Sequence, residues 1–256
     1  MKALVSRSRV LICCATFLCV LLGLAGCETP VTLANPAANK LDVSVTISDA
    51  RNALRASSNT IHIAIVLALA PQPHTVGGSQ TIEGSDAKTL VCNGNTQLQF
   101  SGGSYAGDVP AQTDQYTCTY YWSNGTRSAD IVIPVLIRSL PSIRDPASGD
   151  TVSVPASGDP GVTVSYDGSG ATGAQVVATA SDYNQRSALS DPSPDRGVVT
   201  IPADRFESSF GIGWGTITLT RSLTDVDISA RPSNTAFHSV KVSSFDQAAA
   251  TPVRWL

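Results

Sequence analysis

Cysteine and histidine are the residue types of this chain that are best suited to act as nucleophiles, metal ligands or attachment points. The sequence contains six cysteines and three histidines in 256 residues. Three cysteines lie inside an apolar N-terminal run, one closes that run and two stand far from it: Cys13, Cys14 and Cys19, then Cys27, then Cys92 and Cys118. The chemistry open to these sulfur atoms therefore depends on the fate of the N-terminal segment.

Residues 1–26 have the features of a secretory signal peptide. Lys2, Arg7 and Arg9 form a basic start without an acidic residue, and an apolar run of about 15 residues follows from Val10 to Leu24. The run is shorter than the ~20 residues that a membrane-spanning helix needs, and no basic flank follows it. We therefore expect residues 1–26 to be removed during export.

The end of this run, Leu24-Ala25-Gly26-Cys27, resembles the lipobox of bacterial lipoprotein precursors, in which an aliphatic residue and two small residues precede an obligatory cysteine. The resemblance implies that the Cys27 thiol receives a diacylglyceryl group, that a peptidase cuts after Gly26, and that the new amine can be acylated as well. Two or three acyl chains anchor a protein stably. The predicted location is the bacterial cell envelope, and the outer membrane if the host has one, because residue 28 is Glu rather than Asp. Ordinary secretion with cleavage near Ala25 is the alternative.

Cys92 and Cys118 are the cysteines that remain after signal removal and lipidation. An even pair in an exported chain predicts one disulfide. It would close a loop of about 26 residues and stabilise the fold by roughly 3 kcal/mol in the chain-entropy model. Two reduced, buried thiols are the alternative.

The remaining candidates for catalysis do not form a recognisable set. His62 lies in an apolar run, His74 in a proline-rich segment and His238 at the start of another run, and no serine sits in a Gly-x-Ser-x-Gly elbow. No local pattern singles out a carboxylate pair for glycoside hydrolysis. Residues 211–215 (GIGWG) superficially resemble a phosphate loop, but a strand pattern follows them, so the glycines are expected to permit a bulge or tight bend. The sequence predicts a protein that is not an enzyme.

Metal binding is not predicted either. With both remaining cysteines paired, no cluster has the spacing of zinc ligands. Calcium stays open, because hard cations take oxygen ligands from turns, although aspartate in a turn more often bonds its own backbone. The aspartates concerned are Asp145, Asp150, Asp159 and Asp167. No cofactor is expected.

Tyr121 and Trp214 are the candidates for ligand binding. Strand alternation places Tyr121 opposite the face of Tyr116, Cys118, Tyr120 and Trp122, and places Trp214 opposite Ile217 and Leu219. Outward aromatic rings stack on sugars or anchor a partner. Cover by a second sheet or another domain is the alternative for both.

Period-two alternation of apolar residues indicates strands along most of the chain. Residues 41–48 form a half-buried strand, and Thr60–Leu69 a central strand covered on both faces. Asn93-Gly94 and Asn124-Gly125 mark two hairpins, because Asn-Gly supplies the positive φ angles of a type I′ turn. A second series of strands is expected at residues 151–154, 162–166, 175–180, 198–201, 215–221 and 237–243. No helical periodicity follows the signal, which predicts an all-β protein.

Length and turn chemistry suggest two tandem β-sandwich domains. The expected segments are the signal peptide at 1–26, a flexible tether at 27–40, a first domain with the disulfide at 41–138, and a second domain at 139–256. Asp114-x-Tyr116-x-Cys118 resembles the tyrosine corner of immunoglobulin domains, and the Pro141–Val152 segment is similar to the first strand of bacterial immunoglobulin-like modules. The spacing between Cys92 and Cys118 is shorter than in true immunoglobulin domains, so the resemblance implies an immunoglobulin-like sandwich only.

Charge narrows the range of partners. Removal of residues 1–26 takes away three basic residues and no acidic residue, so the net charge falls from −3 to −6, and no nucleic-acid partner is expected. The predicted function is that of a non-catalytic, lipid-anchored envelope protein for scaffolding, adhesion or recognition. Its membrane contact would be the lipid on Cys27, and its partner an envelope protein or a glycan. A carbohydrate-binding or carbohydrate-processing surface lipoprotein, with Tyr121 or Trp214 on the sugar, is the alternative, and a soluble secreted subunit is a third.

Overall fold

The structure is a computed structural model that describes residues 31–33, 36–49, 59–71, 82–84, 89–137, 141–168, 171–247 and 250–256. The expected signal peptide at residues 1–26, the expected lipid attachment point Cys27, and His74 lie outside these ranges. The chain divides into two units, residues 1–31 and 32–256. The second unit contains both hydrophobic cores.

The described residues form strands joined by turns and three short 3-10 helices. The strands up to residue 137 are β1 (Val31–Leu33), β2 (Leu41–Asp49), β3 (Thr60–Leu69), β4 (Ile82–Gly84), β5 (Leu90–Cys92), β6 (Thr96–Gln97), β7 (Gln99–Ser101), β8 (Ser104–Pro110), β9 (Gln115–Trp122) and β10 (Arg127–Pro134). The later strands are β11 (Ile143–Asp145), β12 (Thr151–Val152), β13 (Val162–Tyr166), β14 (Gln175–Ser181), β15 (Ser187–Leu189), β16 (Ser193–Pro194), β17 (Val198–Ile201), β18 (Gly213–Asp227), β19 (Ser239–Gln247) and β20 (Thr251–Trp255). The 3-10 helices are η1 (Ala38–Lys40), η2 (Ala203–Arg205) and η3 (Pro232–Asn234).

These elements confirm the predicted all-β class, and the arrangement as two tandem immunoglobulin-like sandwiches stays a prediction. In the described part of the chain, no helix has the length and apolar character required to span a membrane.

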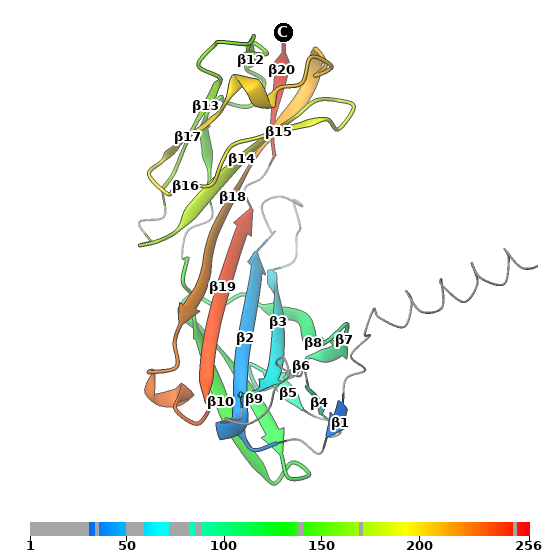
Figure 1. Cartoon of the computed structure of the whole chain (residues 1–256), viewed down its shortest axis with the longest axis vertical. Coiled ribbons are helices and arrows are strands. Elements are labelled where there is room, and N and C mark those ends of the chain that lie inside the picture. The colour runs from blue at the N-terminus through cyan, green and yellow to red at the C-terminus, as the bar shows by residue number, and fades with distance from the viewer. Residues whose placement is uncertain are drawn as a thin grey trace, which may run out of the picture. The chain divides into compact units, whose positions relative to one another are not determined.

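In the described part of the chain, the strands form four sheets. The largest has the order β12-β20-β18-β19-β2-β3-β8-β7, and β14 joins it on β18 together with β15 and β16. Within it, β18, β19, β2 and β3 lie side by side (Figure 1). The other sheets have the orders β10-β9-β5-β6, β11-β13-β17 and β1-β4.

A first core, defined by the buried side chains of β2, β3, β5, β8, β9, β10 and β19 with their neighbours, lies between the large sheet and the β10-β9-β5-β6 sheet. Its inward residues follow the alternation of the sequence: Leu41, Val43, Val45 and Ile47 on β2, and Ile61, Ile63, Ile65 and Leu67 on β3 are all at most 5% exposed. The other face of β3 differs from the prediction of a fully covered strand, because His62 is exposed and Ala64 is only half-buried.

A second core, defined by the buried side chains of β13, β14, β17, β18 and β20 with their neighbours, lies between the large sheet and the β11-β13-β17 sheet. Trp255, Phe206 and Phe210 contact one another edge to face in it. Large aromatic side chains bury the most apolar surface per residue, so this cluster supplies much of the driving force for packing here.

Strand β18 runs through both cores. Its first part pairs with β14 and β20, and its last part, from Thr220 to Asp227, pairs with β19. The first core consequently contains Ile228, Phe237, Val240 and Val242, which lie beyond the expected domain boundary at residue 138. Pairing between strands distant in sequence, such as β19 with β2, carries no local sequence signal. Turn residues therefore cannot show that side chains from beyond the expected boundary pack in the first core.

Residues 36–40, at the end of the expected tether, are folded onto the first core. Ala38 is 2% exposed, the Tyr120 hydroxyl donates to the Pro36 carbonyl at 2.9 Å, and the Ala70 N–H donates to the Lys40 carbonyl at 2.9 Å. A flexible tether would therefore have to end before Pro36.

The disulfide joins Cys92 and Cys118, with both side chains fully buried and an S–S distance of 1.98 Å. The two cysteines are direct partners on the neighbouring strands β5 and β9. The bond thus links the two predicted hairpins within one sheet, whereas the disulfide of an immunoglobulin domain connects two sheets. Both hairpin turns have the expected positive φ angles, 50° and 76° at Asn93-Gly94 and 56° and 77° at Asn124-Gly125.

Candidate functional site

A hollow of about 650 Å³ lies where the turn between β14 and β15 meets the start of β18. We name it the Tyr183–Trp214 hollow, and its lining consists of Ser181, Asp182, Tyr183, Gln185, Ser187, Trp214, Gly215 and Thr216. Trp214 is 61% exposed and Tyr183 is 65% exposed. Two aromatic rings therefore border a depression whose other side chains are polar or absent.

Trp214 points outward because of its place in the alternation of β18. Ile217 and Leu219, on the opposite face of the strand, are fully buried in the second core. Trp214 pairs across the sheet with Arg254, which is exposed on β20. The predicted outward orientation of Trp214 is thus present, and its role in binding stays a prediction.

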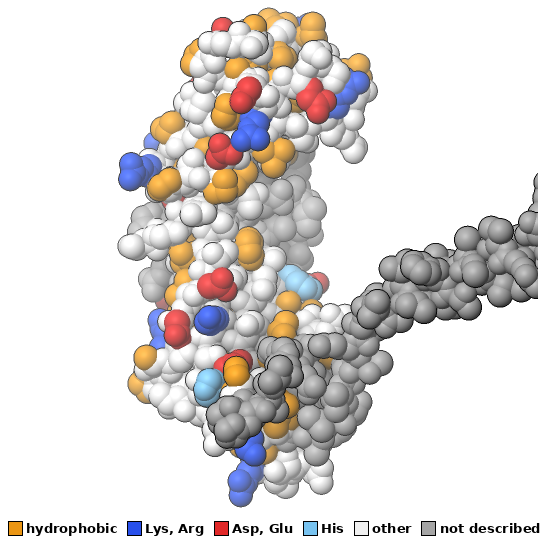
Figure 2. Space-filling view, viewed as in Figure 1, with side chains coloured by type: hydrophobic (Ala, Val, Ile, Leu, Met, Phe, Trp, Pro, Cys, Tyr) orange, Lys and Arg blue, Asp and Glu red, His pale blue; other side chains and the backbone are white. Residues whose placement is uncertain are grey.

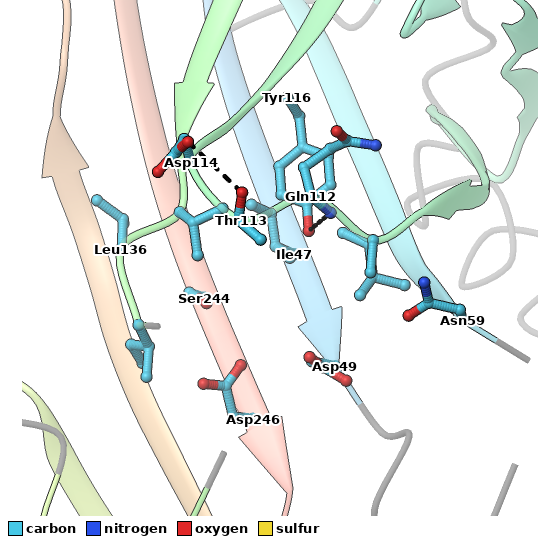
Figure 3. A pocket seen from close by; sticks show the side chains of 14 residues that line it. Ile47, Asp49, Asn59, Gln112, Thr113, Asp114, Tyr116, Leu136, Ser244 and Asp246 are labelled. Atoms are coloured by element: carbon cyan, nitrogen blue, oxygen red, sulfur yellow. Dashed lines mark hydrogen bonds between the residues drawn. The ribbon is translucent and has the colours of Figure 1, made fainter. Parts of the chain in front are cut away.

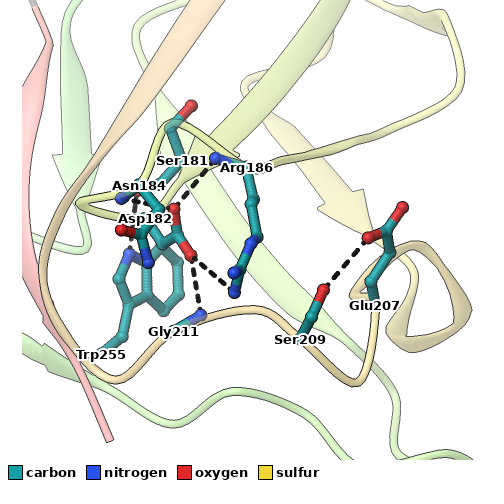
Figure 4. Close-up of polar contacts among 8 residues, drawn as sticks. All are labelled: Ser181, Asp182, Asn184, Arg186, Glu207, Ser209, Gly211 and Trp255. Atoms are coloured by element: carbon teal, nitrogen blue, oxygen red, sulfur yellow. Dashed lines mark hydrogen bonds and ion pairs between the residues drawn. The ribbon is translucent and has the colours of Figure 1, made fainter.

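Asp182 shapes the turn between β14 and β15, and Figure 4 shows its carboxylate with the contacts to Asn184, Arg186 and Gly211. Its Oδ1 accepts hydrogen bonds from the backbone N–H groups of Asn184 at 2.8 Å and Arg186 at 2.9 Å. Its Oδ2 accepts one from the Gly211 N–H at 2.8 Å. A single buried carboxylate therefore closes the turn and ties it to the segment that leads into β18.

The protonation state of Asp182 follows from the same contacts. Burial raises the pKa of this carboxyl, but the N–H donors of Gly211, Arg186 and Asn184 and the Arg186 guanidinium lower it by more. The guanidinium Nη1 lies 3.8 Å from Oδ2. The net pKa lies below the ordinary value of 3.8, so Asp182 is ionised throughout the neutral and mildly acidic range.

Glycines let β18 pass close to this turn. A β-carbon at Gly211 would lie 2.9 Å from Cε1 of Tyr183, and one at Gly215 would lie 2.2 Å from both the Ser181 carbonyl oxygen and Nε1 of Trp255. Nε1 of Trp255 donates to the same carbonyl at 3.1 Å. Close approach of backbone and ring accounts for Gly211 and Gly215, whereas Gly213, with a φ of 125°, follows a bend at residue 212, as expected from the sequence.

Tyr121, the other predicted binding residue, lies elsewhere. It sits half-buried on β9, paired with Ser128 in the sheet of the first core, and it does not line the Tyr183–Trp214 hollow. Tyr183 was not predicted. The sequence feature that could have identified this residue is an aromatic side chain within the polar stretch from Ser181 to Gln185, because such a stretch favours a turn that leaves the ring exposed.

A second cavity of about 470 Å³ lies at the ends of β2 and β19 and contains a carboxylate pair (Figure 3). Asp49 and Asp246 are partners in the parallel register of these strands, and they are 8% and 4% exposed. Tyr116 also lines this cavity, and its hydroxyl accepts a hydrogen bond from the Gln112 N–H at 3.3 Å, as at a tyrosine corner. Because the register of two distant strands brings the carboxylates together, no local pattern could have identified the pair.

The two described histidines lie within hydrogen-bonding distance of aspartates at the surface. Nδ1 of His62 lies 3.0 Å from Asp108, and Nδ1 of His238 lies 2.7 Å from Oδ1 of Asp42. The Ser239 hydroxyl donates to that same Asp42 oxygen rather than to the imidazole. A serine nucleophile needs a base within hydrogen-bonding reach, and this serine bonds a carboxylate instead.

Three of the four aspartates considered for calcium interact with neighbouring groups of the protein. Asp150 and Asp159 each accept the backbone N–H three residues before them, from Ala147 and Ala156, at 2.7 Å. Asp167 forms an ion pair with Arg144. Among the residues that the structure describes, no group of three or more His, Cys, Asp or Glu side chains is placed to hold a metal ion.

No protein-family model matches the chain, and neither does any curated protein sequence.

Proposed function

We propose that the chain is a lipid-anchored recognition protein of a bacterial cell envelope, without a catalytic role of its own. The proposed role in recognition rests on the Tyr183–Trp214 hollow, in which two exposed aromatic rings border a polar depression. Exposed aromatic side chains gathered at one place favour a binding surface, because they supply large contact areas at low conformational cost. The proposed lipid anchor is supported by the resemblance of Leu24–Cys27 to a lipobox.

The β layers around the two cores support the proposed pair of immunoglobulin-like sandwiches. The hydrogen bond of the Tyr116 hydroxyl, two residues before Cys118, supports the resemblance to a tyrosine corner. Sandwiches of this kind place loops and strand ends at their surface on a rigid frame. The hollow lies at such a place, on a turn and the start of a strand.

On the face drawn in Figure 2, acidic and basic side chains are interspersed, and side chains of one sign do not gather in a patch.

One observation favours ligand binding over ligand cleavage at the hollow. The carboxylate in its lining is Asp182, whose side chain is fully buried and engaged by three backbone N–H groups. Glycoside hydrolysis needs two carboxylates that reach the substrate from opposite sides. The hollow therefore suits a partner that is held and released unchanged.

Labelling with radioactive palmitate tests the anchor. The wild-type chain, expressed in a bacterium, is expected to incorporate label and sediment with membranes, whereas Cys27→Ala loses both properties. Cys19→Ser is the matched control, because its residue is removed with the signal, and it should be labelled like the wild type. Label on Cys27→Ala, or none on the wild type, would overturn the anchoring proposal.

Binding to isolated envelopes tests recognition. The mature chain, residues 27–256 with Cys27→Ser so that no lipid is attached, is expected to bind envelope fragments saturably, and Trp214→Ala should weaken this binding by about tenfold or more. Val198→Ala, which trims a residue 52% exposed on β17, is the control and should bind like the parent. Equal binding by the Trp214 variant and the parent would contradict a recognition role for the hollow.

A further inference from the structure

We infer that the Tyr183–Trp214 hollow binds a neutral glycan, with sugar rings stacked on its aromatic side chains. The inference rests on the proposed function, because it names the ligand class of the same surface. It follows from three properties of the hollow: the exposed rings, the uncharged polar groups between them, and a backbone that is fixed before any ligand arrives.

The exposed rings are the first property. Tyr183 and Trp214 are 65% and 61% exposed, and both line the hollow, the first from the turn after β14 and the second from the start of β18. Gly211 and Gly213 pass beneath Tyr183, since a β-carbon at either position would lie within 4 Å of its ring. Sugar rings present C–H groups on their faces, and an aromatic ring with a polar edge offers the flat apolar surface that these groups need.

The polar groups are the second property. The hydroxyls of Ser181 and Ser187 lie 3.1 Å apart, and Gln185 and Thr216 add an amide and a third hydroxyl to the lining. These groups donate and accept hydrogen bonds without carrying charge. Hydroxyls and amides of this kind match the hydroxyls of a sugar.

The one charged side chain among the described residues that line the hollow is already compensated by other groups of the protein. Asp182 contributes no exposed side-chain surface, and its two oxygens are occupied by backbone N–H groups and faced by Arg186. The described lining thus offers an anionic or cationic ligand no exposed ionised side chain to pair with. The affinity for a neutral ligand does not suffer from the lack of exposed ionised side chains, because such a ligand needs no counter-charge.

A fixed backbone is the third property. Trp255, fully buried, bonds the Ser181 carbonyl, and Asp182 joins the turn to Gly211. Gly215 has no room for a side chain at the base of the hollow. Groups that are already ordered lose little entropy on binding, which raises the affinity of a shallow site.

The size of the hollow favours a glycan over a protein partner. Its volume of about 650 Å³ falls within the range of small-ligand sites, roughly 300–1,000 Å³. A stable protein interface buries about 800 Å² on each partner and would have to extend well beyond these side chains. A few sugar rings, by contrast, are accommodated by two aromatic rings and four uncharged polar groups.

Tryptophan fluorescence and calorimetry with defined oligosaccharides test the inference. The probes are trimers of glucose and of N-acetylglucosamine in β1,4 linkage, the α1,4 glucose trimer, and polygalacturonate as an anionic comparison. The lipid-free mature chain (residues 27–256 with Cys27→Ser) is expected to bind at least one neutral trimer with a change in emission. Trp214 is the exposed tryptophan, since Trp255 is fully buried and Trp122 is half-buried, so Trp214→Phe should remove the change while retaining most of the affinity.

Variants complete the test. Trp214→Ala and Tyr183→Ala should each weaken trimer binding by about tenfold or more, and Val198→Ala should leave it unchanged. Affinity should also be the same at low and high salt, because no ionic contact is screened. Circular dichroism and the unfolding midpoint check that each variant is folded. Folded variants are expected, because the substituted side chains are exposed.

Three results would overturn the inference: no binding of any neutral trimer at millimolar concentration, trimer binding that is unaffected by both alanine variants, or binding of polygalacturonate alone with an affinity that falls with salt. The proposed function fails separately. Envelope binding that depends on Trp214 without trimer binding would refute the glycan and leave recognition intact, whereas trimer binding by a chain that palmitate never labels would refute the anchor alone.

Discussion

Arg221 and Asp195 form an ion pair inside the second core, and replacing Arg221 by methionine tests how much of the stability depends on it. Nε of Arg221 lies 2.8 Å from Oδ2 of Asp195, with the two side chains 0% and 1% exposed. Nη2 of Arg221 also donates to the Asp167 carbonyl. Burial and the neighbouring Asp195 carboxylate raise the pKa of Tyr166, which faces the same pair. The guanidinium therefore balances a carboxylate that has no access to water.

Arg221→Met is expected to destabilise the fold by about 3–5 kcal/mol, because it leaves the Asp195 charge buried without its partner. For a chain of this size, that corresponds to a fall in Tm of roughly 6–20 °C. Urea and thermal unfolding of the lipid-free mature chain measure the effect. Arg254→Met, on the exposed face of β20, is the matched control and should cost less than about 0.5 kcal/mol.

The double variant Arg221→Met with Asp195→Leu removes both charges and should recover part of the loss. The cost of the single variant should also shrink in acid, because protonation of the orphaned carboxyl removes the buried, unpaired charge. A loss below about 1 kcal/mol for Arg221→Met, or a double variant less stable than the single one, would refute the reasoning.

Three further predictions concern single features of the fold. Asn234, fully buried on η3, bonds both the N–H and the carbonyl of Val132 on the edge strand β10, so Asn234→Ala should cost about 2–4 kcal/mol in urea unfolding. The pKa of Asp182 is lowered by folding, so its contribution to stability is full above the unfolded value of 3.8 and is lost as the pH falls through the lower folded value. The difference in Tm between wild type and Asp182→Asn should therefore narrow below pH 4. Joint replacement of Cys92 and Cys118 by alanine should cost roughly 3 kcal/mol, for a closed loop of 26 residues.

Each of these has a contrary result. An Asn234 variant as stable as the wild type would mean that the edge of β10 is satisfied without this side chain. A Tm difference for Asp182→Asn that stays constant from pH 7 to pH 2 would contradict a lowered pKa. Unfolding midpoints that are identical with and without a reducing agent would show that the bond between Cys92 and Cys118 contributes nothing to the folded state.

The sequence alone determined the all-β class and the position of most strands. Period-two alternation in residues 41–48 and 60–69 requires one apolar face, and the structure buries that face in β2 and β3. The Asn-Gly turns and the pairing of Cys92 with Cys118 also followed from local chemistry, because positive φ angles and an even number of cysteines in the expected mature chain leave few alternatives. The predicted signal and lipid site depend on residues 1–27 alone, and no folding of the later chain enters into them.

Only the tertiary structure decided which strands are neighbours and which side chains meet. β20, at residues 251–255, has no clear alternation because Thr251 and Pro252 begin it, yet it pairs with β18 and buries Trp255. The parallel pairing of β19 with β2 places Asp246 beside Asp49 across almost 200 residues. Such pairings are set by the packing of whole sheets, so no short segment encodes them.

The candidate site shows the same division. Alternation alone placed Trp214 on the outward face of its strand, since that depends only on the parity of neighbouring positions. It did not place Tyr183 beside it, because the turn after β14 reaches the start of β18 through the antiparallel pairing of these two strands, which ends at Ser181 and Thr216. The Asp182 carboxylate then ties that turn to Gly211. The ring that the sequence identified and the ring that completes the hollow are thus brought together by strand pairing and a buried hydrogen-bond network, both of which exist only in the folded chain.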